Sequence, residues 1–200
     1  MPGPLDGYRV VDLTTMVSGP LTTMILADQG ADVIKVEAPA GDHTRHVARR
    51  RGGFSTSFLN NNRNKRSIVL DLKTPGGVAA LKRLAASADV FIQNFRPGAI
   101  ARLGLDAETL CALNPKLVFV SIAGFGFDGP FAAKPVFDPL IQSLSGLTTV
   151  QAHAARPRLV RTILPDKLTG YACAQAVCAA LLARARRRAP ACAASGPGVG

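Results

Sequence analysis

YRVVDLTTMVSGPLTTMILADQGADVIKVE, residues 8–37, holds a strand-like run, a helix-like run and a second strand-like run in direct succession. Residues 8–14 and 32–37 are short and rich in β-branched side chains, as buried strands are. Residues 21–30 between them are typical of a helix, and Gly30 is a helix stop signal. This order predicts a βαβ unit, in which the two strands lie parallel in one sheet.

The same alternation continues to about residue 125. Thr74 with Pro75, and Asp106 with Thr109, are helix start signals. The further expected elements are strands at 67–72, 90–95 and 117–126 and helices at 74–88 and 106–115. We therefore expect residues 1–185 to form an α/β fold whose sheet is Rossmann-like, doubly wound and mostly parallel.

The loops after the expected strands are rich in glycine, amides and cations. In open α/β sheets a ligand binds beyond the carboxyl ends of the strands, so these loops are the informative ones. Arg45, Lys73, Arg96 and Arg102 all fall in them. Such a set of cations favours an anionic ligand, although a solvated rim of charges has the same residue pattern.

Composition and charge limit the class of protein. With 48% hydrophobic and 18% charged residues, the chain is expected to be globular. Its net charge of +11 raises nucleic acid as a partner. The basic runs are scattered and lack interleaved aromatic residues, so we expect a phosphate-bearing small molecule and no nucleic acid. The apolar stretch at 172–183 is too short for a membrane span and no signal peptide is evident, so we expect a cytoplasmic protein without a membrane partner.

No metal site is expected. The four cysteines show no C-x-x-C pair. His43 and His46 lie in a basic loop without a third ligand nearby, and the surrounding arginines repel a cation.

The end of the chain differs in character from the rest. Residues 186–200, RRRAPACAASGPGVG, have no hydrophobic periodicity and no acid. We expect a low-complexity, disordered tail. A truncated chain and a shifted reading frame near its end both agree with this composition.

Several long motifs in one order resemble the class III CoA-transferases, the family of formyl-CoA transferase and the carnitine CoA-transferases. The motifs are GADVIKVEAPAGDHTR, NKRSIVLDLKT, NFRPGAIARLGLD, NPKLVFVSIAGFG, DPLIQSLSG and PDKLTG. Family members are roughly twice as long and form interlocked homodimers. The resemblance implies a missing second half and doubtful activity for the isolated chain.

The resemblance implies that Asp166 is the catalytic nucleophile. In the family, the matching aspartate attacks an acyl-CoA thioester, and an aspartyl-CoA thioester then passes CoA to a carboxylic acid acceptor. The start of a helix favours the ionised carboxylate that this chemistry needs. From the residues alone, Asp166 has a second interpretation as a simple cap of that helix.

The resemblance also implies a site for CoA or acyl-CoA, which are substrates, and no permanently bound cofactor. The matching positions are Thr15, Met16, Ser18, Leu70, Lys73, Asn94, Phe95, Arg102, Leu103 and Lys134. Apolar side chains suit an adenine, and Lys or Arg suit phosphates. Ala38 stands where some members carry an arginine, so we expect that phosphate contact to be lost or moved to Arg45 or Arg49.

Three alternative functions share parts of this sequence pattern. A racemase of the same fold would need a histidine in the segment Val136-Phe137-Asp138, where this chain has phenylalanine. A dinucleotide-binding Rossmann domain would use Glu37 for a ribose, but the first turn lacks the G-x-G-x-x-G pattern. Finally, the chain could be a non-catalytic remnant that folds poorly or only binds a partner.

Overall fold

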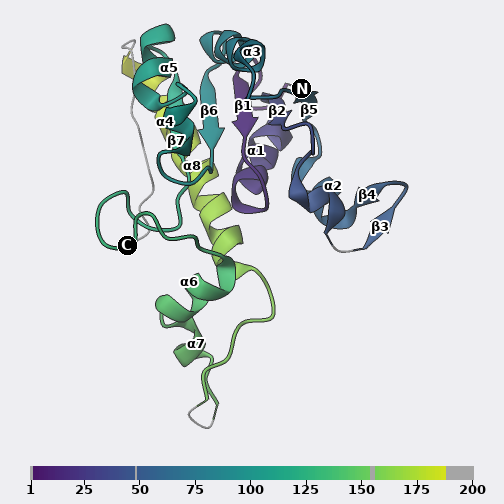
Figure 1. Cartoon of the computed structure of the whole chain (residues 1–200), viewed down its shortest axis with the longest axis vertical. Helices are drawn as coiled ribbons and strands as arrows, with labels where there is room; N and C mark the ends of the chain where they lie inside the picture. The colour runs from purple at the N-terminus through teal and green to yellow at the C-terminus, as the bar shows by residue number, and fades with distance from the viewer. Residues whose placement is uncertain (1, 48, 154–155, 188–200) are drawn as a thin grey trace.

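A five-stranded parallel sheet lies at the centre of the fold (Figure 1). The structure is a computed structural model that describes residues 2–47, 49–153 and 156–187. The strand order is β5-β2-β1-β6-β7, and all neighbouring strands are parallel. The strands are β1 (Arg9–Leu13), β2 (Asp32–Glu37), β5 (Arg66–Val69), β6 (Val90–Gln93) and β7 (Val118–Ser121). The expected doubly wound, Rossmann-like α/β fold is therefore confirmed.

Helices cover both faces of this sheet. Val10 and Val11 of β1 belong to different core clusters, because successive side chains of a strand point to opposite faces. One cluster packs against α1 (Ser18–Asp28) and α8 (Leu164–Arg187). The other packs against α3 (Pro75–Ala86), α4 (Ala99–Arg102) and α5 (Ala107–Leu113). Burial on both faces explains why the strands are continuous apolar runs in the sequence.

The expected helix boundaries have the local geometry that their residues favour. The side chain of Thr74 accepts a hydrogen bond from the backbone N–H of Gly77, and that of Asp106 accepts one from Thr109. After α1, Gly30 has φ = +100°, a conformation that side chains with a Cβ rarely adopt. The sequence predicted these helix boundaries correctly because each signal depends only on residues that are neighbours in the chain.

Two groups of short elements were not expected. Between β2 and β5, where we expected a loop, lie the 3-10 helix η1 (His43–His46), the hairpin β3 (Arg50–Arg51) and β4 (Phe54–Ser55), and α2 (Thr56–Asn62). Between β7 and α8 lie α6 (Asp138–Leu144) and α7 (Leu147–Val150). Elements this short lack the hydrophobic periodicity on which sequence interpretation depends.

The last helix is longer than the sequence indicated. α8 continues to Arg187, so the boundary expected at residue 186 falls within the helix, and residues 188–200 of the expected tail lie outside the described residues. By length and composition, α8 is able to cross a membrane, so the argument that its apolar stretch is too short was wrong. One face of α8 is buried in the core through Cys173, Val177 and Leu181. That packing is typical of the core helix of an α/β layer.

α1 and α8 approach closely at Gly170. A Cβ at this position would lie 2.9 Å from Cδ2 of Leu21 and 3.0 Å from the carbonyl oxygen of Ser18. The hydroxyl of Thr22 donates a hydrogen bond of 3.2 Å to the carbonyl oxygen of Gly170. The glycine therefore lets α8 lie directly against the first turns of α1.

We expect Gly170→Ala to destabilise the chain by about 1–3 kcal/mol, because the added methyl group forces Leu21 or the two helices apart. The matched control is Gly76→Ala, since Gly76 is also helical and has open space around its Cβ position. That change should be neutral or slightly stabilising. Urea unfolding of both variants measures the difference, and equal midpoints would contradict the close approach.

Candidate functional site

The loops after β1 and β6 meet at the point where the chain turns to opposite faces of the sheet. α1 follows β1 on one face, and α4 follows β6 on the other. Asn94 joins the two loops, because its Oδ1 accepts from the N–H of Thr15 at 3.0 Å and its Nδ2 donates to the Thr15 carbonyl at 2.8 Å. Met16 has φ = +71°, an uncommon conformation for such a residue. This is the crevice where open α/β sheets bind ligands.

The buried carboxylate of Asp12 binds the loop after β1, which is the first loop of the crevice. Asp12 at the end of β1 accepts from the N–H and hydroxyl of Thr14 at 2.9 and 2.6 Å. It also accepts from the hydroxyl of Thr23 at 2.6 Å and from Nζ of Lys65 at 3.0 Å. Burial alone would raise the pKa of Asp12, but the positive charges of Lys65 and Lys35 and these hydrogen bonds lower it to about 2. Burial lowers the pKa of Lys65 to about 8.

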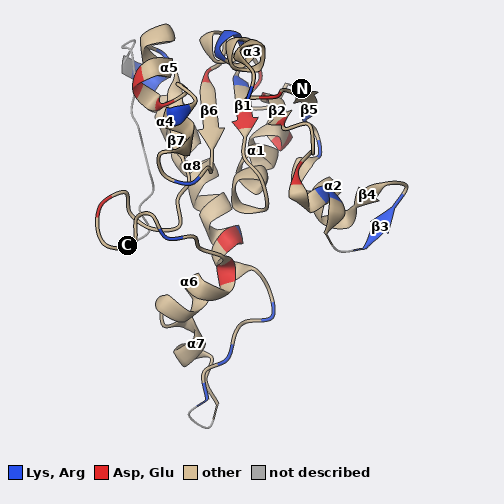
Figure 2. Ribbon diagram, in the orientation of Figure 1, with Lys and Arg blue, Asp and Glu red and all other residues tan. Residues whose placement is uncertain are grey.

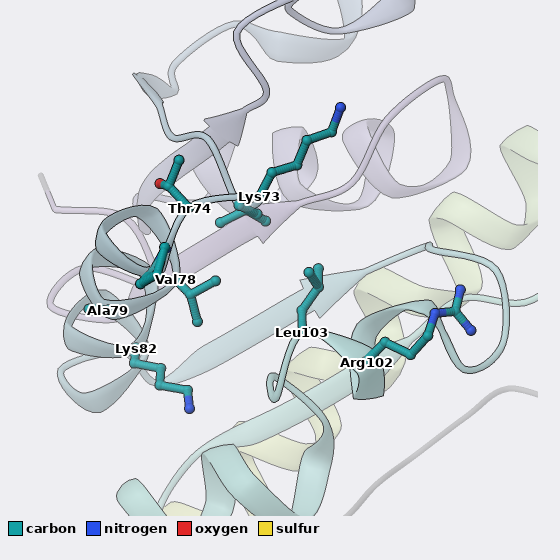
Figure 3. Close-up of a pocket in the computed structure, with 9 residues that line it drawn as sticks. Lys73, Thr74, Val78, Ala79, Lys82, Arg102 and Leu103 are labelled. Carbon is teal, nitrogen blue, oxygen red and sulfur yellow. The ribbon is translucent and has the colours of Figure 1, made fainter.

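An open pocket of about 510 Å³ lies between α3 and the end of α4 (Figure 3). Three of the expected CoA-binding residues, Lys73, Arg102 and Leu103, line it together. The remaining lining residues are Leu72, Thr74, Pro75, Val78, Ala79 and Lys82. An apolar wall with cations at its rim suits a ligand with a flat ring and phosphate groups.

Lys82 is a lining residue that the sequence interpretation missed. It follows Val78 by one helical turn on α3, so both side chains lie on the face that borders the pocket. Its Nζ is close to Gly104, where a Cβ would lie 3.6 Å from it. Helical periodicity counted from Thr74 was the signal that could have found it.

The other expected contacts lie elsewhere. Ser18 opens α1, next to Met16. Leu70 and Phe95 do not line the pocket but pack on the same core cluster as its residues Leu72 and Leu103. Lys134 lies in the loop after β7, with its Nζ 4.7 Å from the ring centre of Phe131. The structure therefore brings Lys134 to an aromatic side chain of its own loop and not into the pocket.

Glu37 and Arg45 form a bidentate ion pair. Nε and Nη2 of Arg45 donate to the two carboxylate oxygens of Glu37, each at 2.7 Å, and the guanidinium carbon lies 3.8 Å from the ring centre of Phe58. Ser67 and the N–H of Asp42 also donate to Glu37, at 2.6 and 3.0 Å. Burial opposes ionisation, but these donors lower the pKa of Glu37 to about 2.

This pair changes two expectations. Arg45 is committed to Glu37, contrary to the idea that it takes over a phosphate contact, whereas Arg49 is exposed. The carboxylate of Glu37 is likewise occupied, so it does not offer the acceptor that a ribose in a dinucleotide-binding domain requires. The dinucleotide alternative has no support in this geometry.

Asp166 lies in the first turn of α8, next to a second carboxylate. Its backbone N–H donates to Oδ2 of Asp138 at 3.1 Å, and Figure 2 shows acidic residues close together where α6 and α8 begin. Burial, and then the charge of Asp138, raise the pKa of Asp166 to about 6. Asp138 therefore caps this turn, and among the described residues the Asp166 carboxylate has no hydrogen bond. The interpretation of Asp166 as a simple cap is not supported.

A second open pocket, of about 680 Å³, borders the start of α8. Ile163, directly before α8, and Lys167 in its first turn line this pocket, and Lys167 directly follows Asp166. The residues that line it from α2 and the turn after it are Thr56, Ser57, Leu59, Asn60, Asn61 and Arg63. Arg63 is paired with Asp28. Lys167 forms no ion pair within the part of the chain that the structure describes.

Comparison with known proteins gives the relationships of the chain. The family described as CoA-transferase family III matches residues 5–189. The probable fatty acyl-CoA transferase Rv3272 of Mycobacterium tuberculosis is 41% identical, over 92% of this chain and 48% of its own length. The succinate–glutarate CoA-transferase of Agrobacterium fabrum is 43% identical, over 90% and 47%. A crystal structure of a CAIB/BAIF family protein from Brucella suis superposes with a TM-score of 0.91, at 38% identity, over 98% of this chain and 52% of that one. The chain thus spans about half the length of these relatives.

Glu37 gives a prediction about acid stability. Its pKa lies near 2 in the folded chain, against a usual value of 4.5. Its ionised form therefore stabilises the fold above pH 4.5, and this contribution is lost as the pH falls towards 2. We expect Glu37→Gln to lower stability at pH 7 and to flatten the fall in stability below pH 4.5, leaving the part due to Asp12. Urea unfolding at several pH values measures this, and an unchanged slope would refute it.

Proposed function

Since the chain belongs to CoA-transferase family III, we propose that it is the CoA-binding, nucleophile-bearing half of an enzyme that moves CoA from an acyl-CoA to a carboxylic acid. The observation that carries this proposal is the pocket shared by Lys73, Arg102 and Leu103 at the carboxyl edge of the sheet. Residues far apart in sequence meet there, in the combination of cation and apolar surface that a nucleotide requires.

The phosphate-bearing end of CoA occupies this pocket in the proposal. Lys73, Lys82 and Arg102 supply positive charge for the phosphates, and Leu103 and Val78 supply apolar surface for the adenine. The pantetheine arm then follows the crevice between the loops after β1 and β6, past Thr15 and Met16. This route directs the thioester towards the N-terminal end of α1, against which α8 packs at Gly170.

Asp166 is the proposed nucleophile. Its carboxylate attacks the thioester carbon of the acyl-CoA, and the C–S bond breaks to leave an anhydride and the CoA thiolate. The thiolate then attacks the aspartyl carbon, which releases the donor acid and forms an aspartyl-CoA thioester. The acceptor carboxylate attacks this thioester and expels the thiolate again. Finally, the thiolate attacks the acyl carbon of the new anhydride, so that acyl-CoA and free Asp166 result.

The proton affinity of Asp166 suits this role. With a pKa of about 6, the group is mostly ionised at neutral pH, as an attacking carboxylate must be. It is also more basic than an ordinary aspartate, which makes it a stronger nucleophile. Partial burial is the main cause of the raised value, and a half-buried charge without hydrogen bonds is less well solvated than an exposed one and therefore more reactive.

The pocket beside α2 is the proposed site for the acyl group and the acceptor acid. Lys167 offers a positive charge next to Asp166, while Asn60 and Ser57 offer hydrogen-bond donors. Relatives of the chain are named for succinate, glutarate and oxalate, which are dicarboxylates. A carboxylate that does not react could pair with Lys167 while its partner reaches Asp166.

Further properties of the whole protein belong to the same proposal. They are an interlocked homodimer, a cytoplasmic location, no membrane or nucleic-acid partner and no permanently bound cofactor. The burial of one face of α8 supports its place in a core rather than in a bilayer. The chain spans about half the length of its relatives. The second candidate is therefore that the chain by itself is a remnant without catalytic activity.

We expect CoA to bind the chain and Lys73→Ala and Arg102→Ala each to weaken binding roughly tenfold, because each removes a charge-assisted contact to phosphate. Arg83→Ala is the matched control, since Arg83 also lies on α3 but does not line the pocket. Calorimetric titration with CoA and dephospho-CoA measures the affinities. Equal affinity in all variants, or no binding at millimolar concentration, would contradict the site.

The nucleophile is tested in a chimaera that joins residues 1–185 to the remaining half of the Agrobacterium succinate–glutarate CoA-transferase. We expect hydroxylamine to trap the aspartyl thioester as a hydroxamate at Asp166. Asp166→Asn should abolish transfer and leave CoA affinity nearly unchanged, because it removes the covalent route and few ground-state contacts. Activity of the Asp166→Asn chimaera would exclude Asp166 as the nucleophile. CoA transfer by the isolated chain would exclude the hypothesis that the chain is an inactive remnant.

A further inference from the structure

Each carboxylate oxygen of Asp138 accepts a hydrogen bond, one from the start of α8 and one from its own helix α6. Its Oδ2 accepts the N–H of Asp166 at 3.1 Å, and its Oδ1 accepts from Nε2 of Gln142 at 2.6 Å. Both Asp138 and Gln142 are buried, although Asp138 opens α6 and carries a charge. A buried carboxylate needs such partners, so its place in the fold requires an explanation.

Gln142 ties the segment before α8 to α6. Its Oε1 accepts from the N–H of Val160 at 2.8 Å, and its Nε2 donates to the carbonyl of Thr162 at 3.0 Å. The same Nε2 reaches Asp138. The two side chains therefore hold the backbone between Val160 and Asp166 at three residues. This segment is not adjacent to α6 in the sequence, because α7 and a loop lie between them.

Only a carboxylate satisfies this arrangement. Both oxygens of Asp138 face donors, namely a backbone N–H on one side and an amide on the other. An asparagine would turn an NH₂ group towards one of these donors and lose that hydrogen bond. The requirement for two acceptors, and not packing volume, thus specifies the residue.

We propose that Asp138, held by Gln142, is a positioning residue that fixes the first turn of α8 and thereby the place of Asp166. This inference rests on the proposed role of Asp166 as the nucleophile. Asp138 does not touch the reacting atoms in this proposal, because its contact is with the backbone of Asp166. It acts through the orientation of the helix start.

The position of Asp138 also has an electrostatic effect. The free N–H groups of a helix start stabilise an anion nearby, and here Asp138 accepts one of them with a full negative charge. It is the charged group that raises the pKa of Asp166, after burial. Among the described residues, Asp138 is the one charged group that contributes to this shift, and Lys167 adjoins Asp166 in the sequence, while the first turn of α1 has no acid. Asp138 thus keeps the nucleophile basic.

The first test titrates Asp166 in the isolated chain by NMR of its side-chain carboxyl carbon. We expect a midpoint near 6 in the wild type and, in Asp138→Asn, a midpoint lower by a fraction of a pH unit up to about one unit, because a neighbouring negative charge is removed while burial, the larger cause, remains. The Asp166 amide should also exchange with solvent about tenfold faster. Ser143→Ala is the control, since Ser143 is exposed on α6 and bonds only within that helix. An unchanged midpoint with an unchanged exchange rate would overturn the proposal.

Gln142→Leu keeps the charge of Asp138 and removes its support. We expect faster exchange of the Asp166 amide with a nearly unchanged midpoint, so the positional and electrostatic effects separate. If Asp138→Asn does not fold, this variant decides the question, and protection of the Asp166 amide equal to wild type would refute the positioning role.

In the chimaera, Asp138→Asn should lower kcat about tenfold or more and leave KM for the acyl-CoA within about twofold, because only the nucleophile is displaced. A purely structural role predicts a lower melting temperature with unchanged kcat per folded molecule. The two proposals fail differently. Activity that survives Asp166→Asn rejects the nucleophile, whereas a normal kcat in Asp138→Asn rejects only the positioning role.

Discussion

The buried carboxylate of Asp12 is the interaction on which the site depends. It stands at the end of the central strand β1 and binds the first loop through Thr14, the body of α1 through Thr23, and the approach to β5 through Lys65. Lys65 extends this connection, because its Nζ also donates to the carbonyl of Pro20 at 2.9 Å. The charge is tolerated in the core only because every part of it is paired. The loop is thereby held rigidly at the switch point of the sheet, where Asn94 joins it to the loop after β6.

A second constraint brings distant parts of the chain to this crevice. α8 follows all the strands of the sheet in the sequence and packs back onto the sheet. It contacts α1 at Gly170, which has no side chain. Asp166 lies one helical turn before Gly170 on the same side of α8, so the close approach also sets the position of the carboxylate relative to the first loop. The glycine therefore links the packing of two helices to the geometry of the chemistry that we propose.

Charges in this fold have two distinct uses. Asp12 and Glu37 have low pKa values because donors surround them, and both serve to hold loops in place. Asp166 has a raised pKa because it is half-buried beside another acid, and within the described structure its carboxylate accepts no hydrogen bond. A carboxylate that is stabilised loses nucleophilicity, and one that is not stabilised keeps it. The environment of each acid, and not its residue type, separates a structural group from a candidate nucleophile.

The sequence by itself determined the class of fold, the order of strands along the chain and the main helix boundaries, because these depend on hydrophobic periodicity and on neighbours such as Thr74, Asp106 and Gly30. It also indicated Lys73 and Arg102, since both follow expected strands, and the family motifs indicated Asp166. Only the tertiary structure decided which of these residues meet. It paired Arg45 with Glu37, kept Lys134 out of the pocket, added Lys82, and put Asp138 against Asp166 across 28 residues of chain. Contacts of this kind depend on how helices pack on the sheet, and no local pattern encodes the distance between two elements that fold onto each other.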